Sequence, residues 1–247
     1  MTNEPYEDFG IDSLAAYLHL LPQQVSRLVN RGKLPGRKVG GQWRFSRAEI
    51  HHWMETRMGL LDGEELARME SVLDRSAGVS NDEFSLSHLL AVESIAVPLE
   101  ARTKSKVILT MTDLAAATGR LWDSDKMAEA VRVREQLHPT ALGNGVALLH
   151  PRRPMSSILS EPVLALGRTT TGIPFGGAGG VMTDIFVLIC STDDRGHLRT
   201  LARISRLISD SELLDLVRTA TDRRQFFRRF WIVRPSWNRN CHVGRSR

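Results

Sequence analysis

Apolar residues in the first thirty positions recur at the three- and four-residue spacing that is typical of helices. Residues 11–18 place apolar side chains on one face and predict a first helix. After a short turn, residues 23–30 predict a second helix that hides Val25, Leu28 and Val29. Pro22 fits the first turn of this second helix, because an N–H there would have no intrahelical partner.

A basic hairpin is predicted after the second helix. The sequence Gly32-Lys33-Leu34-Pro35 ends the helix, and residues 37–45 then form two short strands about a Gly-Gly turn. Ser46 and Glu49 have the spacing of a capping box, which predicts a third helix through Trp53.

The remaining pattern predicts helices and strands in alternation. An acidic amphipathic helix over residues 62–75 and a polar linker over residues 76–85 lead into it. This order favours an α/β layer fold with helices on both faces of a sheet. Helices are expected over residues 105–118 and 124–137 and from Gly196 and Asp210, and strands are expected to end at His150 and to span residues 162–168 and 185–190.

Composition restricts the class of protein. The 247 residues are 42% hydrophobic and 25% charged, which is typical of a globular protein of one small and one larger domain. No apolar run approaches the ~20 residues that span a bilayer, and the polar, acidic N-terminus does not resemble a signal peptide. We therefore expect a cytoplasmic protein without a membrane role. Two cysteines predict neither a disulfide nor a metal site.

Charge is distributed unevenly along the chain. The window from Arg27 to Arg47 holds seven basic residues and no acidic one, and the window from Arg223 to Arg247 holds eight and none. Outside these two windows, 18 basic residues face 28 acidic ones. An acidic body with two basic patches indicates a polyanionic partner for the patches.

The first basic window coincides with the predicted helices and hairpin. Residues 10–57 resemble the excisionase-type, MerR-like winged helix-turn-helix domain, on the segments Leu14 to Leu18, Gly32 to Pro35 and Val39 to Phe45. The resemblance implies that the second helix enters the major groove of double-stranded DNA while the hairpin grips the backbone. The candidate base contacts are Gln23, Gln24, Ser26 and Arg27, and the candidate phosphate contacts are Arg31, Lys33, Arg37, Lys38 and Arg44.

A histidine ends the glycine-bounded apolar run before residue 150. A short buried strand would hold His150 rigidly while its side chain reaches solvent. A neutral imidazole is a nucleophile near pH 7 and can carry a transferable group. Arg134 lies sixteen residues before it and His197 lies forty-seven residues after it, at the start of an amphipathic helix.

Residues from about 84 to 231 resemble the type-2 EIIA domain of the bacterial phosphotransferase system, of the mannitol, fructose and nitrogen-regulatory class. The resemblance rests on Arg134-Glu135, Gly143 to Gly145, His150 and His197-Leu198, in that order. It implies an α/β domain with a mixed sheet, covered by helices on both faces. It also implies that His150 accepts a phosphoryl group while Arg134 and His197 contact its oxygens. The implied partners are an HPr-like histidine phosphocarrier protein and an EIIB domain, with no metal and no cofactor.

Three functions remain open at this point. The first is a DNA-binding regulator whose EIIA domain is phosphorylated on His150, and the second is an EIIA phosphocarrier for a fructose- or mannitol-type permease. The third is a DNA-binding protein whose EIIA-like half only dimerises. Leu149 favours this third function, because the family usually has proline there. We expect the DNA-binding domain over residues 10–57, a helix and linker over 58–85, the EIIA domain over 86–231, and a disordered basic tail over 232–247.

Overall fold

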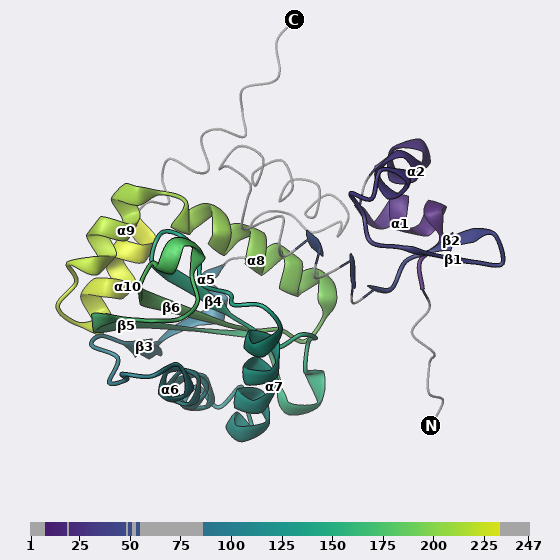
Figure 1. Cartoon of the computed structure of the whole chain (residues 1–247). Helices are drawn as coiled ribbons and strands as arrows, with labels where there is room; N and C mark the ends of the chain where they lie inside the picture. Colours follow the sequence, from purple (N-terminus) through teal and green to yellow (C-terminus); the bar gives the residue numbers. More distant parts are fainter. Residues whose placement is uncertain (1–7, 19, 48, 51–52, 55–85, 233–247) are drawn as a thin grey trace, which may run out of the picture. The chain divides into compact units, whose positions relative to one another are not determined.

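The computed structural model describes residues 8–18, 20–47, 49–50, 53–54 and 86–232 (Figure 1). The chain divides into two units: an N-terminal unit of residues 1–84 together with 198–206, and a larger unit of residues 85–197 and 207–247. The helix predicted over residues 62–75, the linker and the basic tail beyond residue 232 lie outside the described residues.

Both predicted N-terminal helices are present. α1 spans Ile11–Leu18, and α2 spans Pro22–Asn30 and so begins at its proline. Leu14, Val25 and Val29 are buried, as their spacing predicts, whereas Leu28 is only half-buried. The polar residues of α2 are therefore left on its outer face.

A left-handed turn ends α2. Gly32 has a φ of +65°, and the N–H groups of Gly32 and Lys33 donate to the carbonyls of Val29 and Leu28. These two bonds form a Schellman motif, which favours glycine because a Cβ is strained at this φ. Lys33 is thereby exposed directly after the helix.

The predicted hairpin follows. β1 spans Arg37–Val39 and pairs antiparallel with β2, which spans Gln42–Arg44. The Gly-Gly turn between them has φ angles of +57° and +81°. Two positive φ angles in a two-residue loop define the turn that matches the twist of a hairpin.

The third predicted helix is present in part. Residues 47, 49, 50, 53 and 54 are helical. Ile50 donates its N–H to the carbonyl of Ser46 at 3.0 Å. Ile50, Met54 and Phe45 are buried, so this helix and the hairpin contribute to the core of the N-terminal unit.

A four-stranded mixed sheet forms the centre of the larger unit, with strand order β3-β5-β6-β4. β3 and β5 are parallel, β5 and β6 are antiparallel, and β6 and β4 are parallel. The expected mixed sheet is confirmed. The strands span Leu90–Ala96 (β3), Val146–Leu149 (β4), Val163–Ile173 (β5) and Thr183–Cys190 (β6).

Helices flank this sheet, as expected. In Figure 1, α6 (Lys104–Ala116) and α7 (Ser124–Leu137) lie below the sheet, whereas α9 (Ser211–Arg218) and α10 (Arg223–Ile232) lie above it. α6 and α7 agree closely with the helices predicted at these positions. The other helical segments are α5 (Leu86–Leu89), α8 (Asp194–Ile208) and the 3₁₀ turns Ser156–Ile158 and Ala178–Gly180.

One apolar core joins the sheet to α6 and α7. It includes Met111 of α6, Val131 of α7, Leu149 of β4 and Phe186 of β6. Because side chains alternate along a strand, Leu149 faces this core and the next residue faces away from it. β4 and β6 are parallel neighbours, so their carboxyl ends meet at one edge of the sheet. That edge brings His150 and the segment after β6 together.

Candidate functional site

His150 follows directly after β4. Its Nδ1 lies 2.8 Å from the carbonyl oxygen of Leu148. A carbonyl can only accept, so Nδ1 carries the proton of this bond. In the neutral imidazole, Nε2 then has the lone pair. The backbone of β4 thus selects the tautomer in which Nε2 is the nucleophile.

His197 approaches the same place from the end of β6. It lies in the first turn of α8, where its N–H donates to the carbonyl of Asp193 at 3.0 Å. Its Nδ1 is 3.3 Å from the hydroxyl oxygen of Ser191, the residue that follows β6. The ring centroids of His150 and His197 are 5.2 Å apart and the rings are tilted by 51°. The two predicted histidines therefore meet, and Ser191 is a neighbour that the sequence pattern did not reveal.

Both imidazoles are buried. His150 is 2% exposed and His197 is 3% exposed. The prediction that the His150 side chain reaches solvent is wrong. The bond to the Leu148 carbonyl holds the ring close to its own strand, and the ring of His197 packs beside it.

Arg134 lies in the last turn of α7 and is also buried. Its Nη1 donates to the carbonyl oxygen of His138 at 2.8 Å. The segment after His138 runs antiparallel beside β4, since Ala141 bridges to Ala147 and the N–H of Leu148 donates to the carbonyl of Thr140. The bond to His138 therefore anchors the guanidinium at the end of β4 that carries His150.

Glu135 follows Arg134 in α7, and its carboxylate forms an ion pair with a residue of another helix. Its Oε2 lies 2.8 Å from Nζ of Lys104, at the start of α6. The sequence held a signal for the burial of this pair of charges. Arg134 and Glu135 stand three and four residues after Val131, so they continue the buried face of α7.

Leu149 occupies the position of the family's usual proline. It pairs with Leu188 of β6 and is fully buried in the core with α6 and α7. The N–H of Leu148 donates outward to Thr140, so strand alternation directs the N–H of Leu149 toward β6. The added N–H lies in the sheet rather than at the imidazole, and it gives no physical reason for a looser site.

The glycine before β4 has a structural role at the other end of the strand. Gly145 has a φ of +84°, and a Cβ there would lie 2.8 Å from Nη2 of Arg218 and 3.1 Å from Oδ1 of Asp184. Arg218 and Asp184 form a two-pronged ion pair at 2.9 and 3.1 Å. The same Nη2 donates to the Asn144 carbonyl at 2.6 Å. The glycine is therefore needed for packing against this ion pair.

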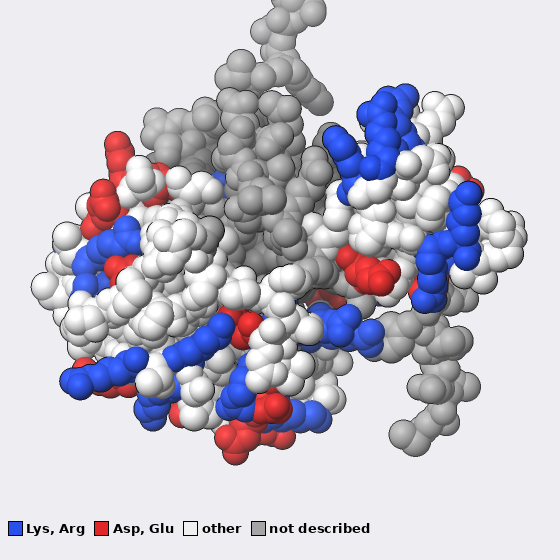
Figure 2. Space-filling view, in the orientation of Figure 1, with Lys and Arg blue, Asp and Glu red and all other residues white. Residues whose placement is uncertain are grey.

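The outer face of α2 carries most of the predicted DNA contacts. Gln23, Gln24 and Arg27 are exposed, and Ser26 is half-buried. Oε1 of Gln24 accepts a bond from the N–H of Leu21 at 2.8 Å, so part of this side chain caps its own helix. Arg31 and Lys33 are exposed at the end of α2. Figure 2 shows Lys and Arg side chains gathered over α2 and over the hairpin.

The hairpin divides its predicted phosphate contacts between two faces. Strand alternation places Arg37 and Arg44 on one face and Lys38 with Trp43 on the other. Nζ of Lys38 lies 5.2 Å from the centroid of the Trp43 ring. Arg37 and Arg44 therefore cannot contact a DNA backbone through the same face of the hairpin as Lys38.

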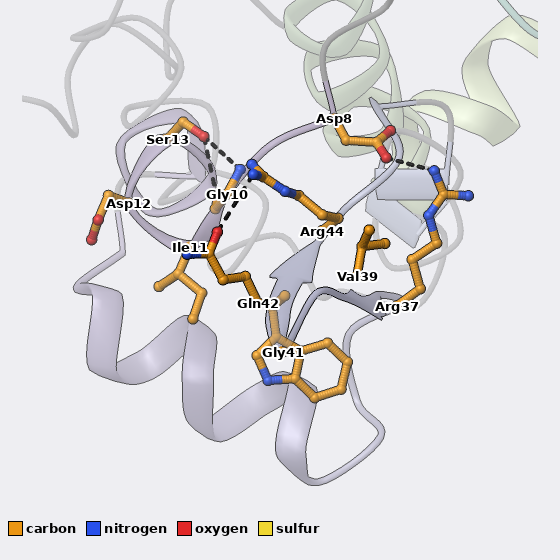
Figure 3. Close-up of a pocket in the computed structure, with 11 residues that line it drawn as sticks. Asp8, Gly10, Ile11, Asp12, Ser13, Arg37, Val39, Gly41, Gln42 and Arg44 are labelled. Atoms are coloured by element: carbon orange, nitrogen blue, oxygen red, sulfur yellow. Dashed lines mark hydrogen bonds and ion pairs between the residues drawn. The ribbon is translucent and has the colours of Figure 1, made fainter.

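The arginine face lines a hollow of about 1100 Å³ beside the start of α1 (Figure 3). Arg37 forms an ion pair with Asp8 at 2.6 Å across this hollow, and Arg44 contacts Gln42 at 3.5 Å. Asp12 also lines it. The charge of Arg37 is thus offset by Asp8, whereas the contact of Arg44 is with the neutral amide of Gln42.

An α/β unit in which His150 follows β4 and His197 lies in the first turn of α8, together with a helix-turn-helix and a hairpin, defines a two-module protein of the EIIA class. Residues 88–230 match the family described as "Phosphoenolpyruvate-dependent sugar phosphotransferase system, EIIA 2". This match covers more than half of the chain, which belongs to that family. Residues 9–58 match the helix-turn-helix domain.

The relatives share the larger unit. The chain is 29% identical over 147 residues to the nitrogen regulatory protein of Bradyrhizobium diazoefficiens, covering 58% of this chain and 92% of that protein. It is 28% identical over 130 residues to the fructose-specific EIIABC component of Bacillus subtilis, covering 52% of this chain. The match spans only 20% of that component.

A solved structure shows the same fold. The crystal structure of nitrogen regulatory protein IIA-Ntr from Neisseria meningitidis superposes with a TM-score of 0.53 at 19% identity, covering 59% of this chain and 98% of that one. Within the described part of the chain, no helix is long and apolar enough to cross a membrane.

Proposed function

We propose that this protein is a DNA-binding regulator whose EIIA domain accepts a phosphoryl group on His150 from an HPr-like phosphocarrier protein. The observation that supports it most is the bond from Nδ1 of His150 to the Leu148 carbonyl, which leaves the Nε2 lone pair for nucleophilic attack. The nearby His197 ring and the anchored Arg134 are donors suited to phosphoryl oxygens.

The transfer is a single displacement at phosphorus. The Nε2 lone pair of His150 forms the new N–P bond while the N–P bond of the donor phosphohistidine breaks, and that electron pair stays on the donor imidazole. Arg134 and His197 stabilise the charge on the three equatorial oxygens. Because His150 is buried, its ring must become accessible before a protein donor can reach it.

The helix-turn-helix unit supplies the proposed DNA contacts. Arg27, Arg31 and Lys33 are exposed cations on and after α2, where the N-terminal match expects a recognition helix. Arg44 and Lys38 extend the basic surface on opposite faces of the hairpin. Phosphorylation would add roughly −1.5 to −2 charge units at His150, by analogy with hydroxyl phosphates. We propose that this charge changes DNA affinity.

The test is phosphorylation by phosphoenolpyruvate, enzyme I and HPr, followed by stability of the label in acid and in base. We expect an acid-labile, base-stable label on the wild type, no label on His150→Ala, and normal labelling of His88→Ala, a control at an exposed histidine. A wild type that takes no label, or a label that survives His150→Ala, would contradict the proposal.

The alternative function, a sugar phosphocarrier, rests on the similarity to the fructose-specific EIIABC component. It predicts that labelled protein passes its phosphate to a fructose-type EIIB domain. The regulator predicts instead that labelling changes the affinity for duplex DNA. A folded protein that binds DNA and never takes label would favour the third function, a phosphoryl-inactive EIIA-like domain.

A further inference from the structure

Glu135 is a buried carboxylate with an ion pair to one oxygen and hydrogen bonds to the other. It is 3% exposed. One oxygen pairs with Nζ of Lys104 at 2.8 Å. The other accepts from the N–H of Thr140 at 3.1 Å and from the Thr140 hydroxyl. A buried charge is tolerated only when it is paired and hydrogen-bonded, and this one is.

Lys104 is itself held in place. Besides the ion pair, its Nζ lies 3.4 Å from the carbonyl oxygen of Phe175 and 4.7 Å from the centroid of the Phe175 ring. The side chain therefore ties the start of α6 to the end of α7 and to the loop after β5. A cation fixed on three sides can offset the charge of Glu135 without moving.

The segment that Glu135 holds is the one that runs beside β4. The carbonyl of Thr140 accepts from the N–H of Leu148. The carbonyl of Leu148 in turn accepts from Nδ1 of His150. One residue before Glu135, Arg134 donates to the carbonyl of His138. The last turn of α7 thus grips residues 138–140 at two points, and those residues border the strand that ends at His150.

We propose that Lys104, Glu135 and Thr140 are positioning residues for phosphoryl transfer. They fix residues 138–140 against β4, so that the guanidinium of Arg134 and the ring of His150 keep their relative placement. Lys104 has a second effect, since it neutralises a carboxylate that would otherwise repel the incoming phosphoryl group. This inference rests on the proposed function, because it assigns residues to the same reaction.

The test compares side chains of matched shape. Thr140→Val keeps the shape and removes the hydroxyl, whereas Thr140→Ser keeps the hydroxyl. Thr112 is the control, because it also carries a buried hydroxyl, which donates to the carbonyls of Ile108 and Leu109 within α6 instead of to Glu135. We expect Thr140→Val to slow single-turnover labelling by HPr about tenfold to a hundredfold, the range for a small misplacement of reacting groups. Thr140→Ser should restore the rate, and Thr112→Val and Thr112→Ser should leave it unchanged.

Lys104→Met and Glu135→Gln separate charge from geometry. We expect Lys104→Met to lower kcat for labelling with little change in KM for HPr. Glu135→Gln keeps an acceptor for Thr140 and removes the charge that Lys104→Met leaves uncompensated, so the double variant should be faster than Lys104→Met alone. A merely structural role would change the melting temperature without this split between kcat and KM and without this partial rescue.

A second measurement does not depend on phosphorylation of the protein. The ¹⁵N side-chain resonances of Arg134 and His150 should shift in Thr140→Val and stay in place in Thr112→Val. Labelling of Thr140→Val within twofold of the wild type, or equal slowing by Thr112→Val, would overturn the inference. If the wild type takes no label, the proposed function fails, and unchanged resonances in Thr140→Val would then overturn the positioning network as well.

Discussion

At the residue scale, the geometry of one imidazole defines the chemistry of the site. Nδ1 of His150 donates its proton to the Leu148 carbonyl, so this nitrogen has no lone pair with which to attack phosphorus. The phosphoryl group is therefore expected on Nε2. Long-range ¹H–¹⁵N spectra of the ¹⁵N-histidine protein check this, because they distinguish the two modified nitrogens. A phosphoryl group on Nδ1 would show that the Leu148 bond breaks before transfer.

Cys190 gives a second prediction at this scale. Burial raises the pKa of its thiol from the usual 9.0 to about 12. Because the folded protein holds this proton more tightly than the unfolded chain does, the thiol contributes to the free energy of unfolding. This contribution is fully present below pH 9 and is lost as the pH rises toward 12. Between pH 9 and 11, the free energy of unfolding should fall with pH less steeply in Cys190→Ala than in the wild type, by up to about 1.4 kcal/mol per pH unit.

Urea titrations at pH 8, 9, 10 and 11 measure these slopes. Cys241 is present in both proteins, so their difference isolates Cys190. Parallel slopes would mean that the thiolate is as well tolerated in the folded protein as in the unfolded one. In the folded state at pH 8, the thiol of Cys190 should also resist alkylation, since the thiolate is the reactive form.

At the scale of elements, α7 has a defined start, and its other end carries Arg134 and Glu135. Asp123 is its N-cap and accepts from the N–H of Lys126 at 2.9 Å. Replacing Asp123 by Ala should cost about 1 kcal/mol of unfolding free energy, while Asn keeps the accepting oxygen and should cost much less. Urea titration of both variants measures these costs. Equal values for Ala and Asn would assign the effect to the charge at the helix N-terminus instead of the cap.

The elements also show where periodicity fails as a guide. β3 was not predicted, because Leu90–Ala96 carries the polar residues Glu93 and Ser94 and so shows neither an apolar run nor a strict alternation. β5 extends to Ile173, past the predicted end at 168. The pattern missed this extension because residues 169–172 are three threonines and a glycine instead of an apolar run. Both strands are fixed by pairing with neighbours far away in the sequence. Such pairing is not contained in a local pattern.

At the scale of the whole molecule, the exposed positive charges determine how DNA affinity is expected to change with salt. A substitution that removes one bond to a DNA phosphate should reduce the steepness of the plot of log affinity against log salt by about one. Arg31→Ala should show such a change on a duplex of arbitrary sequence. Arg37→Ala should show a smaller one, because Asp8 already pairs with Arg37.

Fluorescence anisotropy with a labelled duplex between about 50 and 200 mM salt, a range over which a few phosphate contacts change affinity strongly, provides the measurement. Each variant is compared with the wild type at the same salt. Equal changes in slope for Arg31→Ala and Arg37→Ala would mean that DNA displaces Asp8 from Arg37. No change for either would remove this surface from the proposed interface.

The sequence by itself determined the local elements and the chemical inventory. Apolar spacing predicted α1, α2, α6 and α7, paired glycines predicted the hairpin turn, and the order of Arg134, Gly145, His150 and His197 indicated the family. These are properties of neighbouring residues or of residue type, and both can be read directly from the chain.

Only the tertiary structure decided how those residues meet. The parallel pairing of β4 with β6 brings His150 to His197 across forty-seven residues, and the Leu148 carbonyl selects the tautomer. Folding also buries both rings and pairs Glu135 of α7 with Lys104 of α6. The physical reason is that burial and hydrogen-bond partners depend on strand order and helix packing, which bring together positions that local periodicity treats as independent.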